Sequence, residues 1–350
     1  MHINTKGWER IEAKNLLANN QIKLINKKKE VLKDNTILPF LKNKNNKEVF
    51  KVLSFVKSKF KNIDKILLIG TGGSSLGAKV FLEIIKDSQI YFLENLDPNS
   101  INFFLEKYKK KRLGLLVISK SGETIEIISL FEIIMNKLSK NINFNKNAVI
   151  VSDNKDSILK NIANKFNIFF VNHEKNIGGR YSCFSVTGLL PLNLAGYNAS
   201  NAKKMADTFF NNILLNNKKE NLNSTCILSS IIKKKKYTGH VFLCYLDNYY
   251  QLGQWYKQLW NESLGKEQLG LHLITAQGAI DQHSQLQMWM DGPKNLIFSV
   301  VLPKKRAKDL KVQDKRKILP YYLKNKKAGE ILNIMGEATV FELKKAGIPT

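Results

Sequence analysis

The stretch KILLIGTGGSSLGAK, residues 65–79, decides the fold. Its first six residues are an apolar, β-branched run that ends in glycine, as is typical of a buried strand. The glycine and serine residues that follow are typical of a tight turn, and LGAK opens a segment with helical periodicity. A strand that passes through a turn directly into a helix is the opening unit of a parallel α/β sheet.

The same alternation of apolar runs and helical segments continues along the chain. Segments such as IEIISLFEIIMNKL, residues 125–138, have the apolar spacing of a helix. The predicted strands are residues 65–70, 89–96, 114–120, 148–153, 167–172, 240–246, 271–278 and 295–303. Strands that alternate with helices favour parallel sheets covered on both faces. We therefore predict an α/β protein with two doubly wound parallel-sheet domains, each an αβα sandwich.

The length of 350 residues suits about two domains of roughly 150 residues each. An apolar connecting helix is predicted at GLLPLNLAGYN, residues 188–198, and a polar stretch rich in Asn and Lys follows at residues 211–223. We predict three parts, namely an N-terminal helical arm (1–48), a first domain with phosphate-binding turns (49–200) and a second domain (201–350).

The composition excludes several classes of protein. No apolar run approaches the roughly 20 residues of a membrane-spanning helix, and the first ten residues lack the apolar stretch of a signal peptide. Cys183, Cys226 and Cys244 are widely spaced and form no C-x-x-C pair, which argues against a disulfide framework and a zinc site. We expect a cytoplasmic protein with no metal and no membrane partner.

The net charge of +27 comes from lysine. Only five of the 56 basic residues are arginine, so 51 are lysine, and they are spread along the chain. A protein that recognises nucleic acid would use more arginine, whose planar fork matches phosphates and guanine edges. We therefore predict no nucleic-acid partner, and each of the few arginines becomes a candidate for a role that needs its fork.

Two predicted strand-to-helix turns carry hydroxyl groups, GTGGSSLGAK (70–79) and SKSGET (119–124). The first is not a dinucleotide fingerprint, because position 75 is Ser75, nor a P-loop, because Gly77 is followed by Ala78. Hydroxyls and backbone N–H groups at a helix start can bind a phosphate dianion. Either turn alone is as typical of an ordinary helix cap. Two in one sheet predict a phosphate site without a nucleotide cofactor.

These turns also carry a resemblance to a known family. GTGGSSLG, ENLDPNS (94–100) and SKSGETIE are similar to the sugar-isomerase domain. NIGGRYSCFSVTGLLPLNLAG (176–196), QWYKQLWNESLGKE (254–267) and DQHSQLQMWMDGP (281–293) resemble the glucose-6-phosphate isomerase family, in the family's order. The resemblance implies reversible isomerisation of glucose 6-phosphate and fructose 6-phosphate through a cis-enediol intermediate, in glycolysis and gluconeogenesis, with no cofactor.

Three residues take catalytic roles by this resemblance. Glu262 matches the base that moves a proton between carbons 2 and 1, and we expect it to be buried enough to return the proton readily. Arg180 matches the arginine that stabilises the enediolate, a role that requires a fixed cation. His283 matches the residue that opens the sugar ring, since a histidine can take and give protons near neutral pH.

The resemblance also implies the residues that hold the substrate, a hexose 6-phosphate. Phosphate- and substrate-binding positions are Gly73, Ser74, Ser119, Lys120, Ser121, Thr124 and Gln258. In the family the histidine matched by His283 reaches the site of the partner subunit, which implies a homodimer.

The chain departs from the family at its end. Family members continue into a C-terminal helix with a lysine that assists ring opening, and no segment here matches it before the chain ends at LKKAGIPT. We expect either a fragment or a substitute residue, and we assign the role to neither Lys344 nor Lys345. An isomerase of another hexose phosphate such as mannose 6-phosphate, a non-catalytic sugar-phosphate-binding protein and a nucleic-acid binder are the alternative functions.

Overall fold

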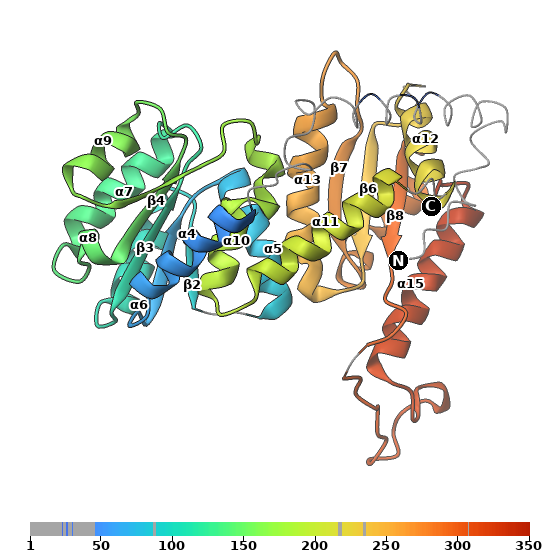
Figure 1. Ribbon diagram of the computed structural model, residues 1–350. Coiled ribbons are helices and arrows are strands. Elements are labelled where there is room, and N and C mark those ends of the chain that lie inside the picture. The colour runs from blue at the N-terminus through green and yellow to red at the C-terminus, as the bar shows by residue number, and fades with distance from the viewer. Residues whose placement is uncertain are drawn as a thin grey trace. The chain divides into compact units, whose positions relative to one another are not determined.

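The structure, a computed structural model, describes residues 46–86, 89–215, 219–233, 236–306 and 308–350, together with Lys23, Asn26 and Glu30. The predicted N-terminal arm, residues 1–48, lies almost entirely outside the described residues. The chain divides into two compact units (Figure 1). Residues 30–216 form the five-stranded unit, and residues 217–350 belong to the three-stranded unit.

The five-stranded unit is built on a parallel sheet with the strand order β2-β1-β3-β4-β5. Its strands are β1 (Lys65–Ile69), β2 (Ile90–Leu93), β3 (Leu113–Ile118), β4 (Ala148–Ser152) and β5 (Phe169–Asn172). Each lies within or next to the apolar run that predicted it, so all five predictions are confirmed.

Helices cover both faces of this sheet (Figure 1) because successive strand residues point to opposite sides. Ile66 and Leu68 join one core with residues of α4 (Asn46–Lys59), α5 (Leu76–Ile85) and α10 (Val186–Leu194). Leu67 and Ile69 join the other core with residues of α6 (Pro98–Tyr108), α7 (Ile125–Leu138) and α9 (Ile158–Lys165). The short helix α8 (Phe144–Asn147) and the longer α11 (Ala199–Leu215) complete the unit. The helix predicted at residues 188–198 is α10, which is almost wholly buried.

The three-stranded unit repeats this design with β6 (Gly239–Cys244), β7 (His272–Gln277) and β8 (Leu296–Val301) in the parallel order β7-β6-β8. One core joins the sheet to α12 (Lys219–Lys233) and α13 (Tyr250–Leu264). The opposite core joins it to α14 (Leu286–Asp291) and α15 (Ala328–Lys345). The three predicted strands and the doubly wound fold of both sheets are therefore confirmed.

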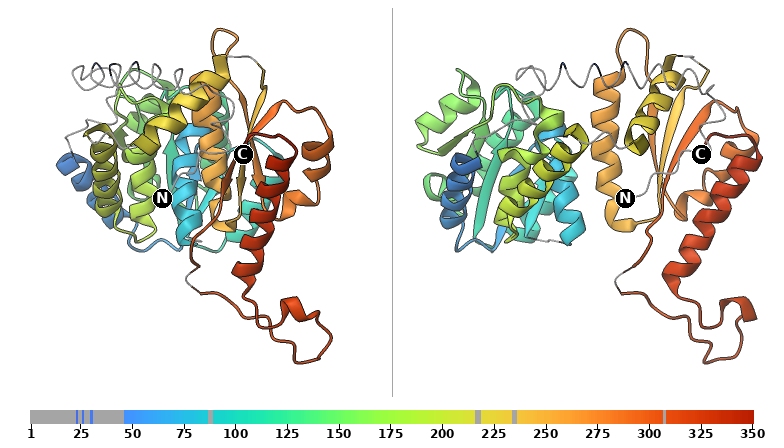
Figure 2. Two further views of the ribbon diagram at one scale, coloured as in Figure 1. Left: turned by 90° about the vertical axis from the view of Figure 1, so that its right-hand side faces the viewer. Right: turned by 45° about the vertical axis from the view of Figure 1, so that its right-hand side comes forward.

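Helix α15 is a feature that the sequence pattern does not predict. It runs beside the sheet of the three-stranded unit (Figure 2), and its buried residues are Gly329, Gly336, Thr339 and Leu343. Their spacing suits one face of a helix, but two of the four are glycines and one is polar, so the apolar periodicity is weak. Within the described part of the chain, no helix combines the length and apolarity needed to cross a membrane.

Candidate active site

The two hydroxyl-rich turns lie side by side at the carboxyl ends of β1 and β3. These strands are neighbours in the sheet, with Ile69 paired to Val117. A Cβ atom added to Gly70 would lie 3.3 Å from the carbonyl oxygen of Ile118. The strand order reverses between β1 and β3, and this switch point is where parallel sheets of this order bind ligands.

The second turn brings three hydroxyl groups together. The Ser119 Oγ lies 3.0 Å and the Ser121 Oγ 3.3 Å from the Thr124 Oγ1. Thr124 occupies the N-cap position of α7, yet its side chain makes no capping hydrogen bond. The capping explanation of this hydroxyl is therefore wrong in the structure, and the three hydroxyls converge at the positive end of a 14-residue helix.

The neighbouring strand β4 and helix α9 support this turn. Gly122 has a φ of +70°, and a Cβ atom there would lie 2.4 Å from the Ser157 Oγ and 2.8 Å from the Ser152 Oγ. Only glycine fits such a backbone conformation without strain. The Lys120 carbonyl accepts a hydrogen bond of 3.0 Å from the Asp153 N–H, so the backbone of the turn is fixed on both sides of Ser121.

The first turn is fixed by a partly buried polar network that the sequence reasoning missed. The Ser75 Oγ donates to the Glu94 Oε1 at 2.5 Å, and Lys79 pairs with the other carboxylate oxygen of Glu94. Ser75 is fully buried, and Glu94 follows directly on the end of β2. Through this network Glu94 holds the start of α5, directly after Ser74. The signal available in the sequence was a Glu at the carboxyl end of a predicted strand.

Arg180 is built onto the first turn. A Cβ atom on Gly73 would lie 2.3 Å from the Gly179 carbonyl carbon and 2.9 Å from the Arg180 nitrogen. The buried Ser182 Oγ lies 3.0 Å from the Gly73 oxygen and 2.6 Å from the Gly179 oxygen. The Arg180 guanidinium lies 4.5 Å from the centroid of the Tyr181 ring. Gly73 thus permits a close backbone contact with the segment that carries Arg180, and Ser182 was not among the predicted site residues.

The remaining candidates lie on the three-stranded unit. Gln258 and Glu262 are one turn apart on α13, and the Gln258 amide donates to the Glu262 Oε2 at 3.3 Å. Glu262 is exposed, so the burial that was expected for its carboxylate is not observed. His283 is also exposed and follows the short 3-10 helix Ile280–Gln282 after β7.

The turn that carries His283 is closed by Asp281. The Asp281 carboxylate accepts hydrogen bonds from the Gln277 N–H at 2.7 Å and the Ser284 hydroxyl at 2.8 Å. Burial alone would raise the pKa of Asp281, but the hydrogen bonds from Gln277, Gln285 and Ser284 outweigh it and lower this pKa. Asp281 therefore stays ionised and holds the turn over the neutral pH range.

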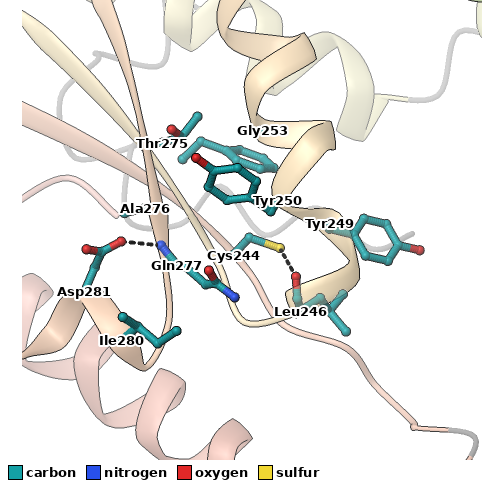
Figure 3. Close-up of a pocket in the computed structure, with 11 residues that line it drawn as sticks. Cys244, Leu246, Tyr249, Tyr250, Gly253, Thr275, Ala276, Gln277, Ile280 and Asp281 are labelled. Atoms are coloured by element: carbon teal, nitrogen blue, oxygen red, sulfur yellow. Dashed lines mark hydrogen bonds between the residues drawn. The ribbon is translucent and has the colours of Figure 1, made fainter. Parts of the chain in front are cut away.

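A cavity of about 80 Å³ lies next to this turn (Figure 3). It is lined at the carboxyl ends of β6 and β7 by Cys244 and Gln277, at the start of α13 by Tyr249 and Tyr250, and by Asp281. None of the predicted site residues lines it. The cavity is large enough for a few ordered waters.

The fold and the paired hydroxyl turns define the class, a parallel α/β protein with a sugar-isomerase fold. Residues 18–320 match the family model described as phosphoglucose isomerase, and the chain belongs to this family.

Similarities to known proteins support the assignment to this family. The chain is 34% identical to a glucose-6-phosphate isomerase of Campylobacter jejuni, over 83% of this chain and 73% of that protein. It is 32% identical to a probable glucose-6-phosphate isomerase of Methanococcus maripaludis, over 72% of this chain but only 60% of that protein. A solved structure of a hypothetical protein from Thermus thermophilus matches 95% of this chain and 82% of that chain, with a TM-score of 0.82 and 25% identity.

Proposed function

We propose that the chain interconverts glucose 6-phosphate and fructose 6-phosphate as an aldose-ketose isomerase. The observation that carries the proposal is the contact between the Gly73 turn and the Arg180 segment at the switch point of the sheet. It supports a phosphate site and a fixed cation at one end of one sheet. The relatives named as glucose-6-phosphate isomerases support the choice of substrate.

The phosphate group would bind to the hydroxyls of Ser119, Ser121 and Thr124 at the start of α7, with Ser74 contributing from the first turn. A dianion at this place accepts short, charge-assisted hydrogen bonds and interacts favourably with the helix dipole. Because the turn is held by Gly122 and the Lys120 carbonyl, the hydroxyls need little rearrangement to bind.

Proton transfer would be the work of Glu262. Its carboxylate would remove the proton from carbon 2 of the open-chain sugar and return a proton to carbon 1, while the hydroxyl proton of carbon 2 moves to the oxygen of carbon 1, so the enzyme ends unchanged. Negative charge develops on the substrate oxygens in the enediolate, and the Arg180 guanidinium would stabilise it there. Gln258, which donates to Glu262, would orient the carboxylate.

His283 would open the ring by moving a proton from the anomeric hydroxyl to the ring oxygen. We propose that it does so in the site of the partner subunit of a homodimer, and its exposed side chain supports such a role. We also propose a cytoplasmic location, which is supported by the three buried cysteines, since none of them forms a disulfide.

The test is a coupled assay in which fructose 6-phosphate is converted to glucose 6-phosphate and oxidised by glucose-6-phosphate dehydrogenase. Turnover that disappears in Glu262→Gln supports the proposal. A thermal shift with fructose 6-phosphate but no turnover would instead indicate a sugar-phosphate-binding protein. Faster turnover of mannose 6-phosphate than of glucose 6-phosphate would assign the chain to the alternative isomerase.

A further inference from the structure

Helix α15 lies beyond residue 320, where the match to the family model ends, yet it contacts the turn that carries His283. Figure 2 shows this helix along the sheet of the three-stranded unit. Its residue Thr339 is 5% exposed although threonine is polar. A buried hydroxyl in a helix needs hydrogen-bond partners, and the partners of this one lie on the His283 turn and at the end of β6.

Thr339 is the centre of a small buried network. Its Oγ1 donates to the Met335 carbonyl oxygen at 2.9 Å, within α15. It accepts from the Tyr245 hydroxyl at 3.2 Å and from the side-chain amide of Gln282. A hydroxyl offers one donor and two acceptor sites, so these three bonds use it fully.

Gln282 depends on this network for its position. Its side-chain nitrogen also lies 3.4 Å from the Met335 carbonyl oxygen, so this nitrogen makes two hydrogen bonds to α15. Its Oε1 is buried and has no hydrogen-bond partner among the described residues. The bonds of the amide nitrogen to α15 are therefore what holds this side chain, which belongs to the residue directly before His283.

Tyr245 closes the other side of the turn. Its side chain is fully buried, and a Cβ atom added to Gly278 would lie 2.4 Å from the Tyr245 ring. A Cβ atom added to Gly336 of α15 would lie 3.2 Å from the same ring. The ring is thus packed between the start of the His283 turn and α15, with its hydroxyl directed to Thr339.

We propose that Thr339 is a positioning residue for His283, acting through Gln282 and Tyr245. The imidazole of His283 is exposed, so its location depends on its own turn, and α15 holds the Gln282 side chain of that turn. The inference rests on the proposed role of His283 in ring opening. It predicts that the Thr339 hydroxyl affects one step of the reaction more than the others.

Two variants separate positioning from packing. Thr339→Val keeps the side-chain volume but removes the hydroxyl, whereas Thr339→Ser keeps the hydroxyl but removes a methyl group. Positioning predicts that kcat on cyclic fructose 6-phosphate falls about tenfold in Thr339→Val with little change in KM, and is restored in Thr339→Ser. Exchange of the carbon-bound proton of open-chain sugar with deuterated water should stay within about twofold. The exposed neighbour Glu337, changed to Gln, is the control.

A second measurement does not depend on activity. The imidazole signal of His283 in the proton NMR spectrum, assigned with His283→Gln, should shift in Thr339→Val and return in Thr339→Ser. Gln282→Leu removes the same bond from the other partner and should act like Thr339→Val, so it replaces that variant if Thr339→Val does not fold. An unchanged His283 signal in both, or equal losses in Thr339→Val and Thr339→Ser, would overturn the inference. If the wild type lacks isomerase activity, the proposed function fails, and the NMR comparison still decides the role of Thr339.

Discussion

The two units of the molecule present their candidate residues in opposite ways. In the five-stranded unit, Ser119 is buried and bonded to Thr124, and backbone contacts fix both turns. In the three-stranded unit, Glu262 and His283 are exposed on a helix and a short turn. A phosphate dianion needs a rigid frame of donors, whereas acid and base groups act on atoms that the substrate presents to them. Under the proposed function, the five-stranded unit would hold the phosphate and supply Arg180, and the three-stranded unit would supply the acid and base groups.

The largest expected effect tests the base that is proposed on the three-stranded unit. Glu262→Gln keeps the shape of the side chain but cannot accept a proton, so turnover should fall by about 10² to 10⁴ fold. Substrate binding, measured by calorimetry with fructose 6-phosphate, should change little. Glu267→Gln, an exposed change on the same segment, is the control. Turnover near the wild-type level in Glu262→Gln would remove the base from this unit.

The next effect tests whether the five-stranded unit takes part in the reaction through Arg180. Arg180→Lys keeps the charge but loses the planar fork, and the loss of one stabilising donor lowers turnover by about 10² to 10³ fold. Steady-state kinetics measures this directly. The matched control is Arg112→Lys, since Arg112 pairs with Asp64 at the surface. If both variants turn over alike, Arg180 only shapes its segment.

A smaller effect is expected from the hydroxyls. Replacing Ser119 and Thr124 together by Ala removes two bonds to the phosphate, each contributing about 1.5 to 3 kcal/mol. The affinity for fructose 6-phosphate should fall at least about a hundredfold, while the thermal unfolding midpoint changes little. Ser58→Ala changes an exposed hydroxyl of the same unit and serves as control. An unchanged affinity would place phosphate binding elsewhere.

The smallest effect concerns stability at low pH. Burial lowers the pKa of His240 in the three-stranded unit to about 4, and burial also lowers the pKa of His173 in the other unit. The unfolded chain takes up the proton near pH 6.5, so this stability is present above pH 6.5 and is lost as the pH falls towards 4. For His240 the loss between pH 7 and pH 5 is about 2 kcal/mol.

Urea unfolding at pH 7 and pH 5 measures this loss. No tryptophan occurs in residues 30–216, whereas Trp255, Trp260 and Trp289 lie in the three-stranded unit, so tryptophan fluorescence reports the unit that contains His240. His240→Gln should reduce the difference between the two pH values. An equal difference in wild type and variant would mean that other groups cause it.

Much of the fold was accessible from the sequence because it follows from local patterns. The runs that predict β1 and β3 are apolar over residues 66–70 and 114–118, and SKSGET is a short turn whose hydroxyls are neighbours in the chain. The Thr339–Gln282 bond joins residues 57 apart, and the Ser75–Glu94 bond joins residues 19 apart. Such pairs depend on how helices pack on a sheet, and periodicity carries no information about that.

The exposure of Glu262 could likewise not be predicted from periodicity. The family resemblance identifies this residue and its role, but the exposed fraction of its side chain depends on how α13 packs in the fold. Helix α15 escaped prediction because glycines and Thr339 stand where large apolar residues would mark its buried face. Close packing against Tyr245 and Leu302 requires Gly336, and close packing against Arg306 requires Gly329.

The contact between Gly73 and Gly179 joins two segments that are far apart in the sequence. A Cβ atom at position 73 would lie 2.3 Å from the Gly179 carbonyl carbon, so a larger residue there would move the segment that carries Arg180 away from the turn that carries Ser74. The relative position of these two segments therefore depends on the absence of a side chain at Gly73. A substitution at this position would alter the proposed site although it changes no group that is proposed to touch the sugar.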